Sequence, residues 1–235
     1  MAIATGMISS ETRRVETAGQ NIANIATPGY KRQIAYEEAM AVAGSAQTAS
    51  TAGSAARLSI ATDFSGGKLV HTANPLDLSI TGAGMFEVNT ADGPAYTRYG
   101  AFRRDEEGRL VTAQGWPVQA NGGGDVVLRS NNWRIENDGT VIDDGNPGSS
   151  IRVVTFDDDK KLQRRPDGLF AAQDMQAADA DQPQIKTGFV EASNVQNGTD
   201  MVQMMESMRR IEAAQKLVHV YDDMIGTAIQ RLGDM

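Results

Sequence analysis

Acidic and glycine-rich clusters are the parts of this sequence that could do chemistry. Asp157-Asp158-Asp159 and Asp143-Asp144-Gly145 offer carboxylate oxygens to a cation, and Gly122-Gly123-Gly124-Asp125 offers backbone amides to a phosphate. The second cluster lacks the EF-hand spacing, and the glycines are not followed by the Gly-Lys-Ser/Thr of a phosphate loop. The acidic triplet follows the apolar run 151–156 and precedes two lysines, which favours a solvated turn. We therefore predict turns here, with no metal and no cofactor.

The residue types used most in nucleophilic and metal chemistry are scarce. The chain has no Cys, which excludes disulfides, zinc-thiolate sites and a cysteine nucleophile. His71 and His219 are far apart in sequence, and there is no Gly-x-Ser-x-Gly motif. Glu106 and Glu107 adjoin a glycine in one turn, whereas glycosidase carboxylates flank the bond from ~5–9.5 Å apart. We predict a protein that is not an enzyme, and a carbohydrate-binding or peptidoglycan-acting β domain with oligomerisation arms stays open as the alternative.

Length and charge narrow the classes further. The 235 residues make one large domain or two modest ones, and the net charge of −8 disfavours nucleic acid and anionic membranes as partners. No segment approaches the ~20 apolar residues of a membrane helix. Glu11, Arg13 and Arg14 interrupt the region where a signal peptide would be apolar. We expect a protein that is not inserted in a membrane and is either cytoplasmic or exported without such a signal.

The N-terminal segment 1–26 reads as an amphipathic helix. Steps of three and four residues give an apolar stripe with one polar break, at Glu11: Met1, Ala4, Ile8, Val15, Ala18, Ile22 and Ile25. The helix is predicted to stop at Thr27-Pro28-Gly29, because the residue before a proline is pushed out of the α region.

The C-terminal segment shows the same pattern. Its stripe has polar breaks at Gln215 and Asp222 and comprises Met201, Met204, Met208, Ile211, Val218, Ile225, Ile229 and Leu232. Thr199 or Asp200 is the predicted N-cap, and Gly233 the predicted stop. The clustered methionines could also form a promiscuous or soft-metal face, but their helical spacing favours packing.

Between the two ends the hydrophobic period changes. Residues 39–61 are rich in Ala, Ser, Gly and Thr and are predicted to form a linker, and 62–187 shows short alternating runs separated by turn residues. Predicted core residues of the β region are Leu76, Leu78, Ile80, Phe86, Phe102 and Trp116. Predicted strands lie at 76–80, 85–88, 96–104, 109–113, 116–119, 126–129, 133–136, 140–142 and 151–156.

These elements predict a multi-domain α+β fold. Residues 1–38 and 188–235 would pair as a coiled-coil-like helical domain, into which the antiparallel β-rich domain 62–187 is inserted. Because a lone helix with an exposed apolar stripe is unstable in water, each stripe needs a partner. That partner is either the other terminus or the same pair of helices on a neighbouring subunit, so the pattern indicates an assembly protein.

One segment carries a sharper signal than a helix end. Asn21 and Asn24 lie on successive turns beside the stripe and precede Thr27-Pro28-Gly29-Tyr30. Paired amides can hydrogen-bond a neighbouring backbone, so they could act as a polar lock that fixes the register of the helix. The alternative is an ordinary helix end followed by a turn.

This segment resembles the N-terminal signature of bacterial flagellar rod and hook proteins, Asn-x-x-Asn-x-x-Thr-Pro-Gly-Tyr. Three further motifs resemble that family in the expected order: Asn74–Phe86, Tyr96–Phe102 followed by Gly108–Thr112, and Gly188–Val195. The resemblance spans nearly the whole chain. One departure is Met208-Arg209-Arg210-Ile211, where the family usually has an aromatic residue after the arginine.

The resemblance implies a rod subunit exported through the flagellar type III apparatus, without catalysis or cofactor. Its partners would be copies of itself and other rod subunits, and its place the periplasmic rod of the basal body. Its terminal helices would pack into the inner tube wall with the middle domain outside. The chain is short for a hook protein and slightly short for the distal-rod subunit. Its length therefore favours the second rod subunit of the family, which is related to the distal-rod subunit.

Overall fold

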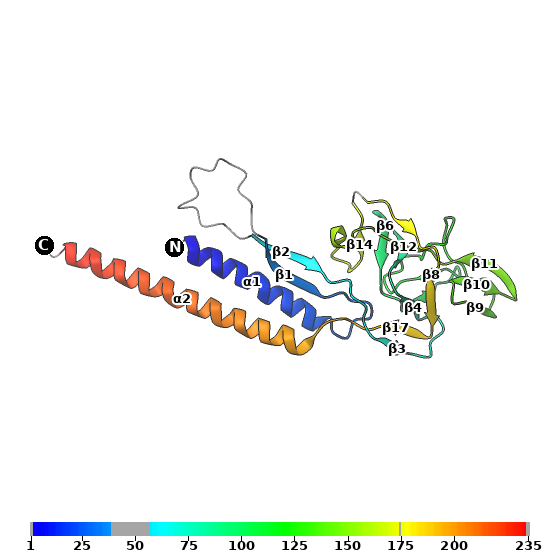
Figure 1. Ribbon diagram of the computed structural model, residues 1–235, viewed down its shortest axis with the longest axis horizontal. Helices are drawn as coiled ribbons and strands as arrows, with labels where there is room; N and C mark the ends of the chain where they lie inside the picture. The colour runs from blue at the N-terminus through cyan, green and yellow to red at the C-terminus, as the bar shows by residue number, and fades with distance from the viewer. Residues whose placement is uncertain (1, 39–56, 174, 234–235) are drawn as a thin grey trace. The chain divides into compact units, whose positions relative to one another are not determined.

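The computed structural model describes residues 2–38, 57–173 and 175–233 (Figure 1). The described residues form two long helices and many short strands, so the α+β prediction is confirmed. The chain divides into two compact units. The helical unit comprises the described parts of Met1–Ala23, Gln33–Ala61 and Val195–Met235, and the β unit comprises the described parts of Asn24–Arg32 and Thr62–Asn194.

The two helices differ in length and partly from their predicted bounds. Helix α1 spans Ala2–Ala23, so the prediction that it continues to residue 26 is wrong and Ile25 lies outside it. The chain turns earlier because the Thr27 amide donates to the Asn24 carbonyl at 3.1 Å and the Thr27 hydroxyl to Asn24 Oδ1 at 3.2 Å. Helix α2 spans Asn197–Gly233; it begins before the predicted caps and ends at the predicted Gly233.

The helical unit also contains strands that the sequence did not predict. Strands β1 (Gln33–Glu38) and β2 (Arg57–Thr62) form a two-stranded sheet. The predicted linker therefore fails at 57–61, where Leu58 is buried and the β-branched Ile60 favours a strand. The rest of that linker, 39–56, lies outside the described residues. Among the described residues, no helix is both long enough and apolar enough to cross a membrane.

The β unit is built around a six-stranded sheet with the order β13-β14-β6-β5-β12-β15. Its neighbouring strands pair antiparallel. The strands are β5 (Met85–Thr90), β6 (Gly93–Thr97), β12 (Val153–Thr155), β13 (Gln163–Arg164), β14 (Phe170–Ala171) and β15 (Ala178–Asp179). A short helix, η1 (Asp159–Lys161), follows β12.

Smaller antiparallel sheets complete the β unit. They pair β4 with β16, β3 with β17, β7 with β8, and β10 with both β9 and β11. Their bounds are β3 (Leu69–His71), β4 (Leu78–Thr81), β7 (Arg103–Arg104), β8 (Leu110–Val111), β9 (Trp133–Ile135), β10 (Thr140–Asp143), β11 (Asn146–Ser150), β16 (Gln184–Thr187) and β17 (Phe189–Glu191). The predicted strands 116–119 and 126–129 form only isolated bridges.

Side chains are buried on both faces of the six-stranded sheet. Because successive residues of a strand point to opposite faces, Met85 packs in one apolar cluster with Tyr96 and Val154, while Phe86 packs in the other. The larger cluster contains the predicted core residues Leu78, Ile80, Phe86 and Phe102, and Leu76 and Trp116 pack against it partly buried. The β unit thus has its own core.

Candidate functional site

Helices α1 and α2 of the helical unit lie side by side and run antiparallel (Figure 1). Asn21 Nδ2 lies 3.4 Å from Asp200 Oδ1, and Arg210 Nη1 lies 3.2 Å from Glu11 Oε1. The residue numbers of both pairs add to 221, so this register places Ala2 opposite residue 219. Helix α2 has 37 residues against 22 in α1, and its last turns therefore extend beyond α1.

The buried stripe of α2 repeats every seven residues. Asp200, Ser207 and Ala214 are buried, and Met204, Ile211 and Val218 are half-buried. Of the predicted assembly residues, Met204, Ile211 and Val218 lie in this stripe. Met201 and Met208 are exposed beside the buried Asp200 and Ser207.

The stripe of α1 is likewise small and polar. Glu11, Thr17, Ala18 and Asn21 are buried, whereas Ile8, Val15 and Ile22 are half-buried. The side chain of Leu232 lies outside the described residues.

The side chain of Asn21 pairs with the backbone of Gln33 in its own chain, and a lock against partner subunits stays a prediction. The Asn21 side chain donates from Nδ2 to the Gln33 carbonyl at 2.8 Å and accepts at Oδ1 from the Gln33 amide at 2.9 Å. Asn21 is completely buried. A buried amide that meets both backbone groups of one residue satisfies them as a strand neighbour would. This pairing fixes the start of β1 against the end of α1.

Large apolar side chains of α2 remain exposed in two groups. The methionine band comprises Met201, Val202, Met205 and Met208. The apolar tail comprises Leu217, Val220, Tyr221, Met224, Ile225 and Ile229. The described side chains from 219 to 230 are all exposed. Contiguous exposed apolar surface of this kind marks an interaction site.

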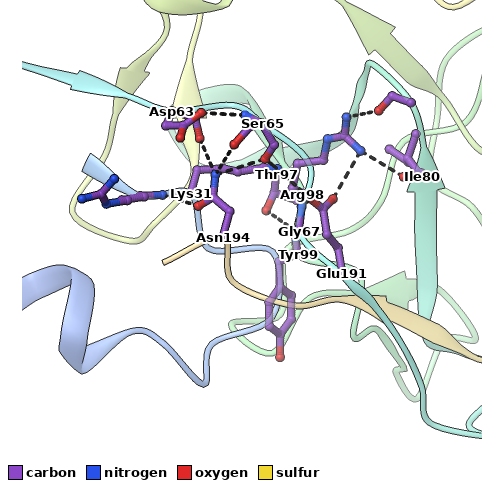
Figure 2. Close-up of polar contacts among 12 residues, drawn as sticks. Lys31, Asp63, Ser65, Gly67, Ile80, Thr97, Arg98, Tyr99, Glu191 and Asn194 are labelled. Atoms are coloured by element: carbon purple, nitrogen blue, oxygen red, sulfur yellow. Dashed lines mark hydrogen bonds and ion pairs between the residues drawn. The ribbon is translucent and has the colours of Figure 1, made fainter. Parts of the chain in front are cut away.

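A second candidate site lies inside the β unit and joins the motif segments (Figure 2). Glu191 accepts from Lys31 Nζ at 2.6 Å and from the Gly67 amide at 2.7 Å, both through Oε1, while its Oε2 lies 3.4 Å from Arg98 Nη1. All three charged side chains are buried. Lys31 also donates to the Ser65 carbonyl at 2.8 Å, and Arg98 donates to the carbonyls of Ile80 and Gly82.

Burial and pairing act against each other in this cluster. Burial lowers the pKa of the Lys31 ammonium, and its hydrogen bond and attraction to Glu191 oppose that change. Burial also lowers the pKa of the Arg98 guanidinium, again opposed by Glu191. Because a buried ion needs a partner, Glu191, which pairs directly with both cations, is central to the cluster. Asp63 and Asp159 add weaker attraction to Lys31 and Arg98 respectively.

The Thr-Pro-Gly-Tyr segment packs on the same cluster. Gly29 has φ +66°, and a Cβ there would come within 2.5 Å of the Arg98 and Tyr99 backbone, so only glycine fits. The Gly29 amide donates to the Glu191 carbonyl at 2.6 Å. The Arg164 guanidinium lies 4.5 Å from the centre of the Tyr30 ring, and Pro28 is half-buried. The motif residues 27–30 therefore form a turn that packs against residues distant in sequence. The sequence alone did not reveal these contacts.

Of the residues considered for chemistry, Asp159 interacts electrostatically with Arg98 and Lys31 of the second site: burial raises the pKa of Asp159, and these two cations oppose that change. Among the described residues there is no group of three or more His, Asp or Glu that could hold a metal ion. Glu106 and Glu107 line an open cleft of the β unit with Arg103, Arg104 and Arg109. Glu107 Oε2 lies 3.4 Å from Arg109 Nη2, and both glutamates are exposed on one turn.

Comparisons with known proteins agree with the motifs. Residues 79–143 match the family described as "Flagellar hook protein FlgE/F/G D1 domain", and residues 186–231 match "Flagellar basal body rod FlgEFG protein C-terminal". The flagellar basal-body rod protein FlgF of Escherichia coli is 32% identical over 250 residues, covering 97% of this chain and 96% of its own. FlgF of Caulobacter vibrioides is 30% identical over 94% of this chain and 92% of its own, and FlgG of Bacillus subtilis 29% over 94% of each.

Proposed function

The chain belongs to the family of flagellar basal-body rod proteins, and from this premise we propose how it assembles. Identity of 30–32% to FlgF proteins over nearly the whole chain makes it a structural rod subunit close to FlgF. Within the rod, we propose that it stacks helically with copies of itself and with other rod subunits. In this arrangement it would transmit motor torque across the periplasm.

The observation that carries the proposal is the continuation of the α2 stripe beyond α1. Met204, Ile211 and Val218 recur every seven residues and are half-buried. The next position in the series is Ile225, which is 42% exposed because α1 begins opposite residue 219. The stripe is covered by α1 up to Val218 and is uncovered at Ile225. This is the geometry of a helix whose apolar stripe packs partly within its own chain and partly against a helix of another subunit.

A neighbouring subunit can supply the missing helix. Fully burying one exposed Ile, Leu or Met side chain contributes about 1.5–3 kcal/mol, so the apolar tail alone can stabilise a subunit contact. Because the methionine band and the apolar tail are different surfaces of one helix, their mutual packing would be heterologous. Heterologous contacts that do not close into a ring extend into a helical filament.

Several finer points belong to this proposal. We propose coiled-coil-like pairing of α1 and α2 in the rod, with the β-rich domain inserted between them and with 1–38 and 188–235 serving assembly. The residues that would bury on assembly include the predicted Ile225, Ile229, Met201 and Met208. We also propose that the chain is exported through the flagellar type III apparatus, as membership of the rod family implies.

Within the family we assign the chain to FlgF rather than FlgG, and localisation of the subunit in basal bodies would test that assignment.

Ile225→Asp tests the assembly surface. A charge placed in the uncovered stripe costs several kcal/mol when a neighbour buries it, whereas the isolated chain keeps it in water. We expect purified I225D to keep the wild-type circular dichroism and tryptophan fluorescence. Cells that carry only I225D should lose motility, and the subunit should be missing from isolated basal bodies.

Gln230→Asp is the matched control. It introduces the same charge five residues later at a position that is also exposed and lies off the stripe. Cells that carry Q230D should swim. Normal motility and normal incorporation of I225D would overturn the proposal that the apolar tail is an assembly surface.

A further inference from the structure

The chain passes between its two units at four places, and three segments of the β unit adjoin these crossings. The crossings follow residues 23, 32, 61 and 194. The adjoining segments of the β unit are therefore 24–32, the stretch that begins at Thr62, and the stretch that ends at Asn194. In a subunit that transmits torque, any load that passes along the backbone between the units travels through these segments.

The side chain of Asn194 bonds to both of the other segments (Figure 2). Its Oδ1 accepts from the Arg32 amide at 2.6 Å, and its Nδ2 donates to the Asp63 carbonyl at 2.8 Å and to the Ser65 carbonyl at 3.1 Å. The Asn194 amide lies 3.4 Å from the Tyr30 carbonyl, and the Asp63 amide donates to the Arg32 carbonyl at 2.8 Å. One half-buried amide group therefore meets all three segments.

Glu191 repeats the arrangement three residues earlier. Its carboxylate joins Lys31 of the first segment to the Gly67 amide of the second, and its own carbonyl accepts from Gly29. A Cβ on Gly67 would come within 1.9 Å of the Ala192 carbonyl oxygen, so the second and third segments are in backbone contact as well. Asn194 and Glu191 thus connect the same three segments at two positions that are three residues apart in the chain.

We propose that Asn194 and Glu191 form a force-sharing clasp that holds segments 29–32, 63–67 and 191–194 as one mechanical element. The hydrogen bonds join separate segments, so a pull on one segment loads bonds to the other two. A load is thereby divided among three connections instead of acting on one. The mechanical role rests on the proposed function as a rod subunit, whereas the coupling of the three segments is a property of the isolated chain.

Asn194→Asp tests the coupling, because it preserves the shape of the side chain and replaces the donor group by a charged acceptor. The acceptor for the Arg32 amide remains, but a carboxylate oxygen now faces the carbonyl oxygens of Asp63 and Ser65. We expect amide hydrogen exchange to rise at least tenfold together at Arg32, Asp63 and Gly67, with no change at core amides such as Val118. Asn146→Asp is the control, since the side-chain hydrogen bond that it disturbs lies within its own turn, from Nδ2 to the Asp144 carbonyl at 3.5 Å.

Asn194→Ala is measured alongside, because it removes the contacts without adding a charge. If both variants loosen all three segments together, the clasp is supported; if exchange rises only at residues next to 194, or not at all, the clasp is overturned. The swimming speed of cells that carry each variant is then compared with that of wild-type cells in media of low and high viscosity. A loss of speed confined to high viscosity supports force sharing. Wild-type speed in both media despite the loosened segments would overturn it.

These outcomes are separable from those of the assembly test. Hydrogen exchange is measured on the purified chain, so it does not depend on rod membership. I225D tests incorporation without touching the clasp. A failed clasp with a confirmed apolar tail would leave the proposed function intact, and the reverse result would leave the coupling of the three segments intact.

Discussion

The two units bury opposite kinds of side chain. The β unit encloses a core of large apolar residues, of which Phe86 and Leu128 have no exposed surface. The helical unit buries Ala18, Ser207 and Ala214 at its stripes and leaves Leu217 and Met224 both 65% exposed. The β unit thus encloses an apolar core within a single chain, while the helical unit leaves large apolar side chains of α2 exposed.

The same contrast holds for ion pairs. In the β unit, Lys31 and Glu191 are 1% and 3% exposed and lie 2.6 Å apart. In the helical unit, Arg14 and Glu37 lie 2.8 Å apart, but their side chains are 26% and 63% exposed. Removing one partner of the buried pair leaves a buried charge and costs much stability, whereas solvent weakens the exposed pair and makes its loss less costly. The predictions below test this contrast at single residues.

The largest effect is expected at the buried carboxylate. Glu191→Gln removes the carboxylate that pairs directly with the buried Lys31 and Arg98 and should lower the free energy of unfolding of the β unit by about 3–5 kcal/mol. Tryptophan fluorescence during denaturant unfolding reports this unit alone, since the chain has two tryptophans, Trp116 and Trp133, and both lie in it. The matched Glu37→Gln should cost ~0–1 kcal/mol in the helical unit. Equal costs would show that the two pairs do not differ in burial in solution.

Leu128→Ala should follow closely. The side chain is completely buried in the larger cluster of the β unit, and truncation leaves a cavity that the neighbours fill only partly. We expect a loss of about 2–5 kcal/mol in the fluorescence-monitored transition. The helical signal in far-ultraviolet circular dichroism, which comes from α1 and α2, provides the internal control. A shift of less than 0.5 kcal/mol (about the effect of an ordinary surface substitution) would contradict the assigned core.

Local patterns were enough to predict the β core and the type of both helices. Leu78, Ile80 and Phe86 were predicted from alternation because a period of two is imposed by the strand itself. Hydrophobicity could not predict which residues of α2 are buried within the chain: it selected Met201 and Met208, whereas the chain buries Asp200 and Ser207.

The Glu191 cluster could not be predicted in the same way. Its members Lys31, Arg98 and Glu191 are far apart in sequence, and charged residues are almost never fully buried unless they are paired. Only the fold shows that the pairing exists. The Thr-Pro-Gly-Tyr motif pointed to this region, but its role as a turn packed on the Arg98 backbone depends on that long-range contact.

Alanine substitutions at two glycines of the β unit distinguish the cost of backbone strain from the cost of a steric clash. Gly29 and Gly115 both have positive φ, but only at Gly29 would a Cβ collide with backbone, whereas Gly115 has nothing within 4 Å. Gly115→Ala should cost the strain of the left-handed conformation, and Gly29→Ala should cost about 1–3 kcal/mol more for the forced backbone shift. Fluorescence-monitored unfolding of both variants measures the difference. Identical losses would mean that the motif turn does not pack on Arg98 and Tyr99.

The smallest effect on folding is expected at Leu217, and it is the counterpart of Leu128. The two substitutions remove the same atoms, but Leu217 is 65% exposed on α2 and alanine is the best helix former. Leu217→Ala should therefore change the helical circular-dichroism transition of the isolated chain by less than ~0.5 kcal/mol. In the assembled rod the same leucine would be buried, so the variant should detach more readily than the wild type when basal bodies are treated with rising denaturant. A large loss of helix stability in the isolated chain would show that Leu217 already packs within its own unit. Unchanged dissociation would remove it from the assembly surface and restrict that surface to the stripe through Ile225.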